Sequence, residues 1–276
     1  MRFFVADGLM NINVLRFDSL ASTNTEAMDQ ARRGADEGLC VVARKQTAGR
    51  GRHGRTWVSD PDAGLYFSIV LRPNLNPDKL PLITLMTGIA VHDALKELGL
   101  APDIKWVNDI LIGDKKIAGI LAESVETPTG HAVIVGIGIN LTSKNFPDEI
   151  AETATSIASE RSGVSAADVE SALVKYLTYW YAILQDNDGT AQIVSEWARR
   201  SSFAEGKQVR ATLHESVVEG VTDGLGSDGA LRIRTSDGSI ATVRAGDVER
   251  LRANDQSSDV LSSAPLRREG FTGGRK

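Results

Sequence analysis

The sequence predicts an α+β fold in which a mixed, mainly antiparallel sheet combines with helices and is followed by a small β barrel. Short apolar segments lie close together over residues 104–139, with turn signals such as Gly113-Asp114 between them, as in antiparallel hairpins. Residues 82–98 carry apolar side chains at helical spacing. After Gly206 the pattern changes to short alternating segments with frequent turns, which is typical of a small barrel.

The first part of the chain contains both strand and helix patterns. Segments that are short, apolar and β-branched predict strands over residues 14–17, 39–44, 65–71, 104–106, 110–112, 117–125 and 131–139. Helical spacing predicts helices over residues 82–98, 169–184 and 193–199. Thr23 and Glu26 have the spacing of a capping box, which predicts a further helix that runs to Arg33 and ends at Gly34. Gly99 ends the 82–98 helix in the same way.

The second part of the chain has a different hydrophobic pattern. Its alternating segments are residues 209–213, 217–222, 231–234 and 240–244, with turns at residues 226–229 and 237–238. A polar stretch follows and continues to the last residue. We therefore expect a first domain over residues 1–204, a small β-barrel domain over residues 205–253 and a disordered tail over residues 254–276.

Composition and charge exclude several classes of protein. The chain has 276 residues, of which 42% are hydrophobic and 24% charged, as in ordinary globular proteins. With 31 Lys+Arg against 36 Asp+Glu, the formal net charge of -5 opposes general nucleic-acid binding. No apolar run approaches the ~20 residues that span a bilayer. The N-terminus lacks a signal-peptide core, so we expect a cytoplasmic protein without membrane contact.

Cysteine and histidine usage argues against a metal centre. The chain has one cysteine, Cys40, which excludes an intrachain disulfide and a thiolate zinc cage. Cys40 lies in an apolar segment and is predicted to be a packed core thiol. The four histidines are too far apart in sequence for closely spaced ligands.

The most distinctive local feature is the segment Gly49-Arg50-Gly51-Arg52-His53-Gly54-Arg55. It contains G-x-G-x-x-G, but no apolar helical stripe follows, so we reject a dinucleotide-binding turn. Glycines let backbone N–H groups approach an anion, and arginines give paired donors to phosphate or carboxylate. We therefore predict an anion-binding loop, with a solvated basic turn as the alternative.

Other polar features each have two interpretations when taken alone. Asn108 and Asp109 at a strand end can bind a nucleotide or metal, or can form a turn. Lys116 at the start of an apolar strand either extends to solvent or points its charge into a cleft. Features that indicate either a ligand or simple local structure are also found at Gly136, Gly138 and Ser22-Thr23-Asn24.

The order of these features is more informative than any one of them. In chain order the motifs are Ser22-Thr23-Asn24, Gln46-Thr47-Ala48-Gly49-Arg50-Gly51-Arg52, Lys105-Trp106-x-Asn108-Asp109, Lys116-Ile117-Ala118-Gly119-Ile120-Leu121-x-Glu123 and Gly136-x-Gly138-x-Asn140. This arrangement resembles the biotin protein ligase family over residues 14–252. The resemblance implies a class II synthetase-like catalytic domain and an SH3-like C-terminal barrel. It also implies an enzyme that forms biotinyl-5'-adenylate from biotin and ATP and transfers biotin to a lysine of a biotin carboxyl carrier protein.

The resemblance also implies roles for matching residues. The biotin-binding residues would be Ser22, Thr23, Asn24, Gln46, Arg50, Gly51, Arg52, Lys116 and Gly119. The ATP- or adenylate-binding residues would be Arg50, Arg55, Trp57, Asn108 and Asn140. Lys116 and Arg52 would be catalytic, because cations offset the repulsion between an attacking carboxylate and a phosphate. Asp109 would contact Mg2+, and the arginine-rich segment would close over the adenylate to exclude water.

The sequence departs from the family pattern at two places. Val107 stands where the family commonly has proline, and His53 replaces a frequent arginine. Only 21 residues precede Ser22, too few for a helix-turn-helix domain, so we expect the single-function type without DNA binding. The expected partner is the carrier domain of acetyl-CoA carboxylase, and a homodimer through a sheet edge stays open. The alternatives are lipoate or octanoyl ligase-like acyl transfer and a nucleic-acid-binding module.

Overall fold

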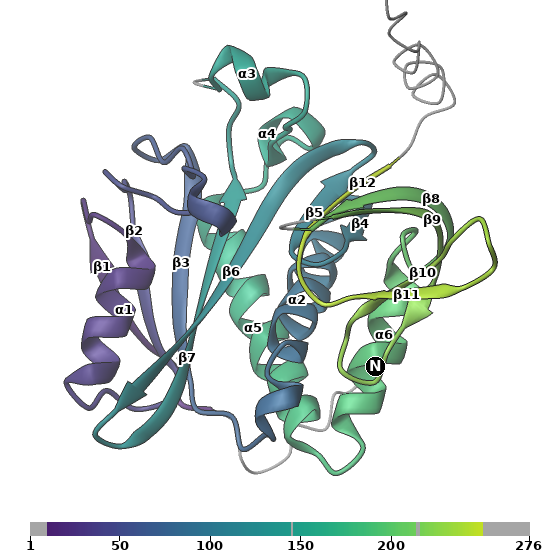
Figure 1. Ribbon diagram of the computed structural model, residues 1–276. Helices are drawn as coiled ribbons and strands as arrows, with labels where there is room; N and C mark the ends of the chain where they lie inside the picture. The colour runs from purple at the N-terminus through teal and green to yellow at the C-terminus, as the bar shows by residue number, and fades with distance from the viewer. Residues whose placement is uncertain (1–9, 145, 214–215, 251–276) are drawn as a thin grey trace, which may run out of the picture.

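The protein is built around two β-sheets (Figure 1). The computed structural model describes residues 10–144, 146–213 and 216–250. The larger sheet has seven strands in the order β1-β2-β3-β7-β6-β5-β4. Its strands are β1 (Asn13–Phe17), β2 (Leu39–Ala43), β3 (Gly64–Leu71), β4 (Pro102–Lys105), β5 (Asp109–Ile112), β6 (Lys115–Thr127) and β7 (Gly130–Asn140). Only β1 and β2 pair in parallel, which confirms the predicted mixed, mainly antiparallel sheet.

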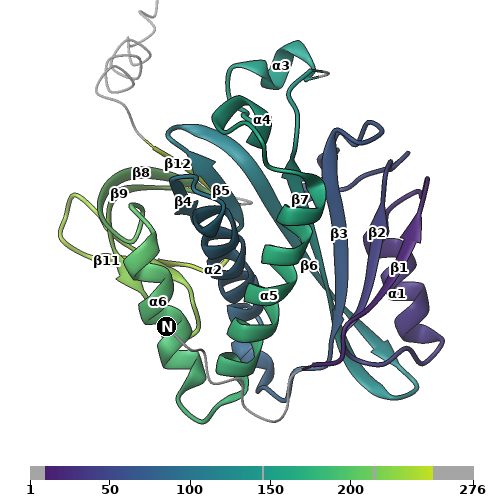
Figure 2. The ribbon, with the colours of Figure 1, turned by 180° about the vertical axis from the view of Figure 1, so that it is seen from behind.

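Helices cover both faces of the larger sheet. The long helices are α1 (Thr23–Arg32), α2 (Leu82–Glu97), α5 (Ala166–Gln185) and α6 (Gly189–Arg200). α1 packs on one face, where its buried alanines join Val41 in a small apolar cluster. Cys40 points to the opposite face and joins the main core with α2 and α5, which Figure 2 shows lying across that face. Successive strand residues alternate between faces, so adjacent residues of β2 belong to different clusters.

The second sheet packs against the start of α2. Its five strands follow the order β11-β10-β9-β8-β12. They are β8 (Glu205–Thr212), β9 (Val217–Leu225), β10 (Leu231–Arg234), β11 (Ile240–Val243) and β12 (Asp247–Arg250). Gly229 lies against Leu82 and Leu85, and its carbonyl oxygen accepts a hydrogen bond of 3.0 Å from Trp106 Nε1. The predicted C-terminal antiparallel β domain is confirmed, and its buried residues belong to the same core as the larger sheet.

The capping box predicted at the start of the first helix is wrong. Ser22 is the N-cap of α1, and no side chain completes the cap. Thr23 Oγ1 instead donates to Gln46 Oε1 at 3.2 Å. A tertiary contact therefore takes the hydroxyl that local pattern assigned to helix capping.

Several short elements of the structure were not predicted from the sequence, or have other bounds than predicted. β12, α3 (Asp148–Ala151) and α4 (Ile157–Glu160) were not predicted, and β4 ends one residue before Trp106. The boundary between residues 204 and 205 stays a prediction, and the predicted tail over residues 254–276 lies outside the described residues. No helix of the described ranges is long and apolar enough to cross a membrane.

Cys40 behaves as the predicted core thiol. Its side chain is fully buried in β2, and Sγ donates to the carbonyl oxygen of Gly38 at 3.4 Å. Burial, followed by the charge of Glu170, raises the pKa of the thiol to about 12. A thiol with so high a pKa is a poor nucleophile at neutral pH.

A partly buried ion pair joins three helices of the core. Asp93 of α2 accepts hydrogen bonds of 2.8 and 2.9 Å from Arg200 of α6 and one of 3.0 Å from Trp180 of α5. Burial raises the pKa of Asp93, but hydrogen bonds from His92, Arg200 and Trp180 outweigh burial and lower it to about 2. Because the folded-state pKa lies below the unfolded value, this stabilisation is present above about pH 4 and is lost as the pH falls through about 2.

Replacing Asp93 by alanine is expected to lower the free energy of unfolding by about 3 kcal/mol. Among the described residues, Arg200 would keep only Glu196 as a charged partner, and Trp180 Nε1 would lose its acceptor. The matched control is Glu97→Ala on the same helix, which removes an exposed ion pair with Lys175. The control substitution is expected to lower the free energy of unfolding by less than about 1 kcal/mol. Urea denaturation at pH 7 measures both values, and equal losses in the two variants would contradict the prediction.

Candidate active site

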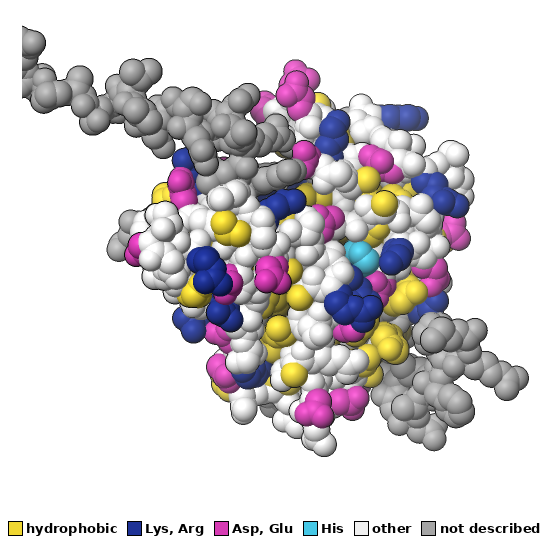
Figure 3. All heavy atoms as spheres, turned by 90° about the vertical axis from the view of Figure 1, so that its right-hand side faces the viewer, with side chains coloured by type: hydrophobic (Ala, Val, Ile, Leu, Met, Phe, Trp, Pro, Cys, Tyr) yellow, Lys and Arg dark blue, Asp and Glu magenta, His cyan; other side chains and the backbone are white. Residues whose placement is uncertain are grey.

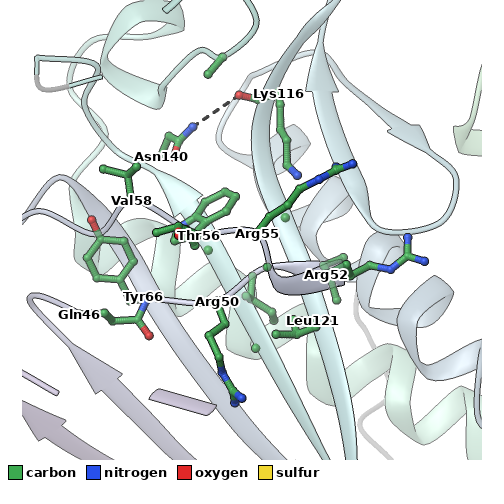
Figure 4. Close-up of a pocket in the computed structure, with 18 of the residues that line it drawn as sticks. Gln46, Arg50, Arg52, Arg55, Thr56, Val58, Tyr66, Lys116, Leu121 and Asn140 are labelled. Carbon is green, nitrogen blue, oxygen red and sulfur yellow. Dashed lines mark hydrogen bonds between the residues drawn. The ribbon is translucent and has the colours of Figure 1, made fainter. Parts of the chain in front are cut away.

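The predicted motifs meet at one pocket. A cavity of about 260 Å³ lies where residues 49–57, here called the arginine loop, cross the strands β6 and β7. Figure 4 shows Lys116 and Asn140 toward one end of the pocket and Gln46 and Tyr66 toward the other. Every site residue selected from the sequence lines it: Ser22, Thr23, Asn24, Gln46, Arg50, Gly51, Arg52, Arg55, Trp57, Asn108, Asp109, Lys116, Gly119 and Asn140.

Glycines in β6 and β7 make room for the side chains of the pocket. A Cβ atom at Gly138 would lie 2.4 Å from the Trp57 ring, and one at Gly136 would lie 2.1 Å from Asn24 Oδ1. At Gly119 a Cβ atom would lie 3.0 Å from the same Trp57 ring. Glycine is therefore required here because protein side chains pack directly on the strand backbone.

The arginine loop is folded back on itself and is tied to the protein around it. Its two arms are joined by a bridge between Arg50 and Thr56 and by a bond of 2.7 Å from Gly51 N to Arg55 O. Within it Arg52–Gly54 forms a single 3₁₀ turn, and no α-helix follows. The rejection of a dinucleotide-binding turn is therefore confirmed.

Each arginine of this loop has a partner elsewhere in the chain. Arg50 pairs with Glu123 of β6 at 3.0 Å, and Arg55 pairs with Asp247 of β12. Arg52 donates to Asn108 Oδ1 at 3.1 Å and also to the carbonyl oxygen of Gly246, just before β12, at 3.4 Å. These contacts tie the loop to the rest of the protein, while the side chains of Arg50 and Arg55 stay exposed, so the anion-binding loop stays a prediction.

Arg52 is the most enclosed of the three arginines. Burial lowers the pKa of its guanidinium, and the carboxylates of Asp247 and Asp109 oppose that effect. A cation that has lost hydration in this way interacts strongly with any anion that enters the pocket.

Lys116 places its charge in the pocket rather than extending to bulk solvent. Its Nζ lies 2.5 Å from Asp109 Oδ1 and 5.5 Å from the centre of the Trp57 ring. The neighbouring Asn108 is held by its own bond of 3.0 Å to Ile120 O. Asn140 Nδ2 donates to Thr155 O at 3.0 Å, which fixes the end of β7 beside Lys116.

Some lining residues were missed by the sequence analysis. Asp247 comes from the second sheet, and Phe146 and Ile150 come from the segment around α3. Ser68 of β3 lies beneath the pocket and is fully buried. None of these has a local signal, because Ser68 sits in an apolar strand and the others reach the pocket only through tertiary packing.

Asp109 is the residue at this site that the sequence predicts as a metal ligand. Among residues 10–144, 146–213 and 216–250, no three or more His, Cys, Asp or Glu side chains are grouped to hold a metal. Asp109, predicted for Mg2+, offers a single carboxylate, which is paired with Lys116. One carboxylate fits a magnesium ion whose remaining ligands are substrate phosphates and water.

Comparison with known proteins defines the class of this fold and site. Residues 16–140 match the biotin/lipoate A/B protein ligase family. Residues 206–251 match the biotin protein ligase C terminal domain. The first match spans the larger sheet and the arginine loop, and the second spans the second sheet. The protein is thus a ligase of the biotin/lipoate class.

Individual relatives narrow this class. The chain is 34% identical over 259 residues to the bifunctional ligase/repressor BirA of Bacillus subtilis, a match that covers 90% of this chain and 77% of the relative. It is 33% identical over 241 residues to the biotin--[acetyl-CoA-carboxylase] ligase of Mycobacterium tuberculosis, a match that covers 84% of this chain and 86% of that relative. The structure of biotin protein ligase from Aquifex aeolicus in complex with biotin and ATP matches with a TM-score of 0.76 and 27% identity, covering 87% of this chain and 99% of that one. This chain belongs to the biotin protein ligase family.

Proposed function

We propose that this protein joins biotin and ATP to form biotinyl-5'-adenylate and pyrophosphate, and then transfers biotin to a lysine of the biotin carboxyl carrier domain of acetyl-CoA carboxylase. The observation that carries this proposal is the meeting of Lys116 and Arg52 with a polar pocket in a chain of this family. Relatives named as biotin--[acetyl-CoA-carboxylase] ligases support the choice of carrier.

The first step brings two anions together. A carboxylate oxygen of biotin attacks the α-phosphorus of ATP, and the bond from that phosphorus to pyrophosphate breaks. Lys116 and Arg52 offset the charge that gathers on the α-phosphate as the new bond forms. In the second step the lysine amine of the carrier attacks the biotinyl carbonyl and AMP leaves, so no covalent bond to the protein is needed.

The remaining pocket residues divide between the two substrates. Ser22, Thr23 and Gln46 offer the hydroxyl and amide groups suited to the polar ring of biotin. Trp57 faces the adenine side, where its Nε1 is buried and has no hydrogen-bond partner among the described residues. Asn108, Asn140 and Arg55 would complete the nucleotide site, with Arg50 and Gly51 over biotin and the adenylate and Gly119 beneath Trp57.

Asp109 would hold Mg2+ when ATP is bound. The ion neutralises phosphate charge. In the protein without substrates, Asp109 instead restrains Lys116 within the pocket.

Pyrophosphate release from biotin and ATP tests the proposal directly. We expect release that depends on both compounds, a biotinyl-adenylate detected by mass spectrometry, and biotin on an added carrier domain detected with streptavidin. Parallel reactions contain lipoate or octanoate in place of biotin. Activity with lipoate or octanoate alone would move the protein to the lipoate ligase group, and inactivity with all three would contradict ligase activity.

The arginine loop is expected to be cut faster by trypsin without substrates than with them. Its glycines allow many backbone states, and an anion bound by its arginines stabilises one of them. Arg50, Arg52 and Arg55 are the cleavage sites. We expect biotin with ATP to slow nicking at least about tenfold, because local opening must then break the ligand contacts. Equal rates with and without ligands would contradict ligand-driven closure.

We further propose the cytoplasm as location, residues 1–204 as the catalytic domain and residues 205–253 as a separate small domain. The use of ATP supports a cytoplasmic location. The two separate family matches support the division into a catalytic domain and a small C-terminal domain. A homodimer would form through a free edge of the larger sheet, at β1 or β4. The net charge of -5 argues against DNA as a partner. Light scattering tests for the homodimer, and a gel-shift assay tests for DNA binding.

A further inference from the structure

A chain of hydrogen bonds runs beneath the pocket from one end of the arginine loop to the other. At the far end of the loop, Ser59 Oγ donates to Trp57 O at 2.9 Å. Gln46 Nε2 donates to the same Ser59 hydroxyl at 2.9 Å. Gln46 Oε1 in turn accepts from Thr23 N at 2.9 Å. The far end of the loop is therefore joined to the start of α1.

The same chain continues through the core to the other end of the loop. Ser68 Oγ lies 2.8 Å from Thr23 Oγ1 and donates to Asn24 Oδ1 at 2.6 Å. Asn24 Nδ2 donates to Glu123 Oε2 at 2.8 Å. Arg50 Nη2 donates to that same carboxylate oxygen at 3.0 Å. Glu123 is therefore the point at which the network under the pocket meets the near end of the loop.

The hydrogen bonds of Asn24 limit what it can do for a ligand. One amide proton goes to Leu121 O at 3.2 Å and the other to Glu123. Its oxygen already accepts from Ser68, and only 3% of the residue is exposed. An amide has two protons to donate, so Asn24 has none left for biotin. Asn24 lines the pocket as part of its rigid wall, in the space that Gly136 leaves open.

We propose that Glu123 is a positioning residue that couples the biotin pocket to the arginine loop, an inference that rests on the function proposed above. Its single carboxylate oxygen holds Asn24 in the wall and Arg50 in the loop at the same time. Moving either Asn24 or Arg50 changes the strength of the other residue's hydrogen bond, because both bonds are charge-assisted and share one acceptor. Glu123 therefore keeps the near end of the loop in register with the wall against which biotin would pack.

Two variants of Glu123 test this coupling. Glu123→Ala removes both bonds, and we expect the KM for biotin to rise about tenfold while the KM for ATP changes less than about twofold. Tryptic nicking of the free protein at Arg50 should become about tenfold faster. Glu123→Gln keeps a neutral acceptor oxygen but loses the charge, so it should be intermediate in both measurements. Glu126→Gln, an exposed position on the same strand, is the matched control and should behave as the parent.

The outcomes separate this inference from the proposed function. The coupling is wrong if Glu123→Ala leaves either measurement unchanged, or if the KM for ATP rises as much as that for biotin. It is also wrong if Glu123→Gln restores one measurement fully and not the other, or if Glu126→Gln has the same effects. A parent protein without biotin-dependent pyrophosphate release overturns the proposed function and the biotin side of the coupling. The nicking comparison needs no substrate and still decides whether Glu123 holds the loop.

Discussion

Replacing Lys116 by alanine is expected to reduce the rate of adenylate formation about a hundredfold or more while the protein stays folded. The side chain leaves β6 for the pocket, where Nζ is 2.5 Å from Asp109 Oδ1. Truncation removes the cation that we propose to face the α-phosphate. It also leaves the Asp109 carboxylate without Lys116, so two effects would oppose anion binding. Biotin-dependent pyrophosphate release measures the rate.

Two further variants separate the charge of this lysine from its packing. Lys116→Met keeps an apolar stem against the Trp57 ring and should be impaired nearly as much as Lys116→Ala, because the charge is what the reaction needs. Lys115→Ala changes the exposed neighbour on the same strand and should release pyrophosphate at the parental rate. Near-normal release by Lys116→Ala would mean that its ammonium group has no part in the chemistry.

Replacing Arg52 by glycine is expected to let biotinyl-adenylate escape about tenfold faster, an effect equal to the loss of one charge-assisted hydrogen bond. From the sequence we expect this arginine to carry little packing, since glycines flank it. The structure corrects that expectation, because Arg52 contacts Asn108 and the backbone of Gly246, just before β12. The variant should therefore also melt slightly earlier than the parent.

Escape is measured with radiolabelled biotin. The adenylate that stays with the protein after rapid gel filtration should fall, and the labelling of lysines on an added bystander protein should rise. His53→Ala, which truncates an exposed side chain in the same turn, is the control and should retain adenylate as the parent does. Retention by Arg52→Gly equal to that of the control would show that the loop closes over the intermediate without this arginine.

Local sequence signals were sufficient for most of the fold. The hydrophobic periodicity of α5 and the alternating segments of the second sheet predicted these elements, because burial on one face leaves a regular pattern in the residues themselves. β12 was missed, since its four residues are too few to show a period. The Thr23-Glu26 spacing misled for the opposite reason: a correct local pattern was overridden by contacts with Gln46 and Ser68.

The sequence by itself indicated the lysine and the arginines that the pocket contains. Lys116 was recognisable as a charge at the start of an apolar segment, and the arginine loop as a dense cationic segment in an acidic chain, because both are properties of neighbouring residues. Tertiary structure alone decided what these groups touch. Arg55 meets Asp247, 192 residues away, and Asn24 meets Glu123, 99 residues away. Such pairs form only when the second sheet packs on α2 and α1 packs on the larger sheet. The spacing of residues along the chain does not show which distant segments packing brings together.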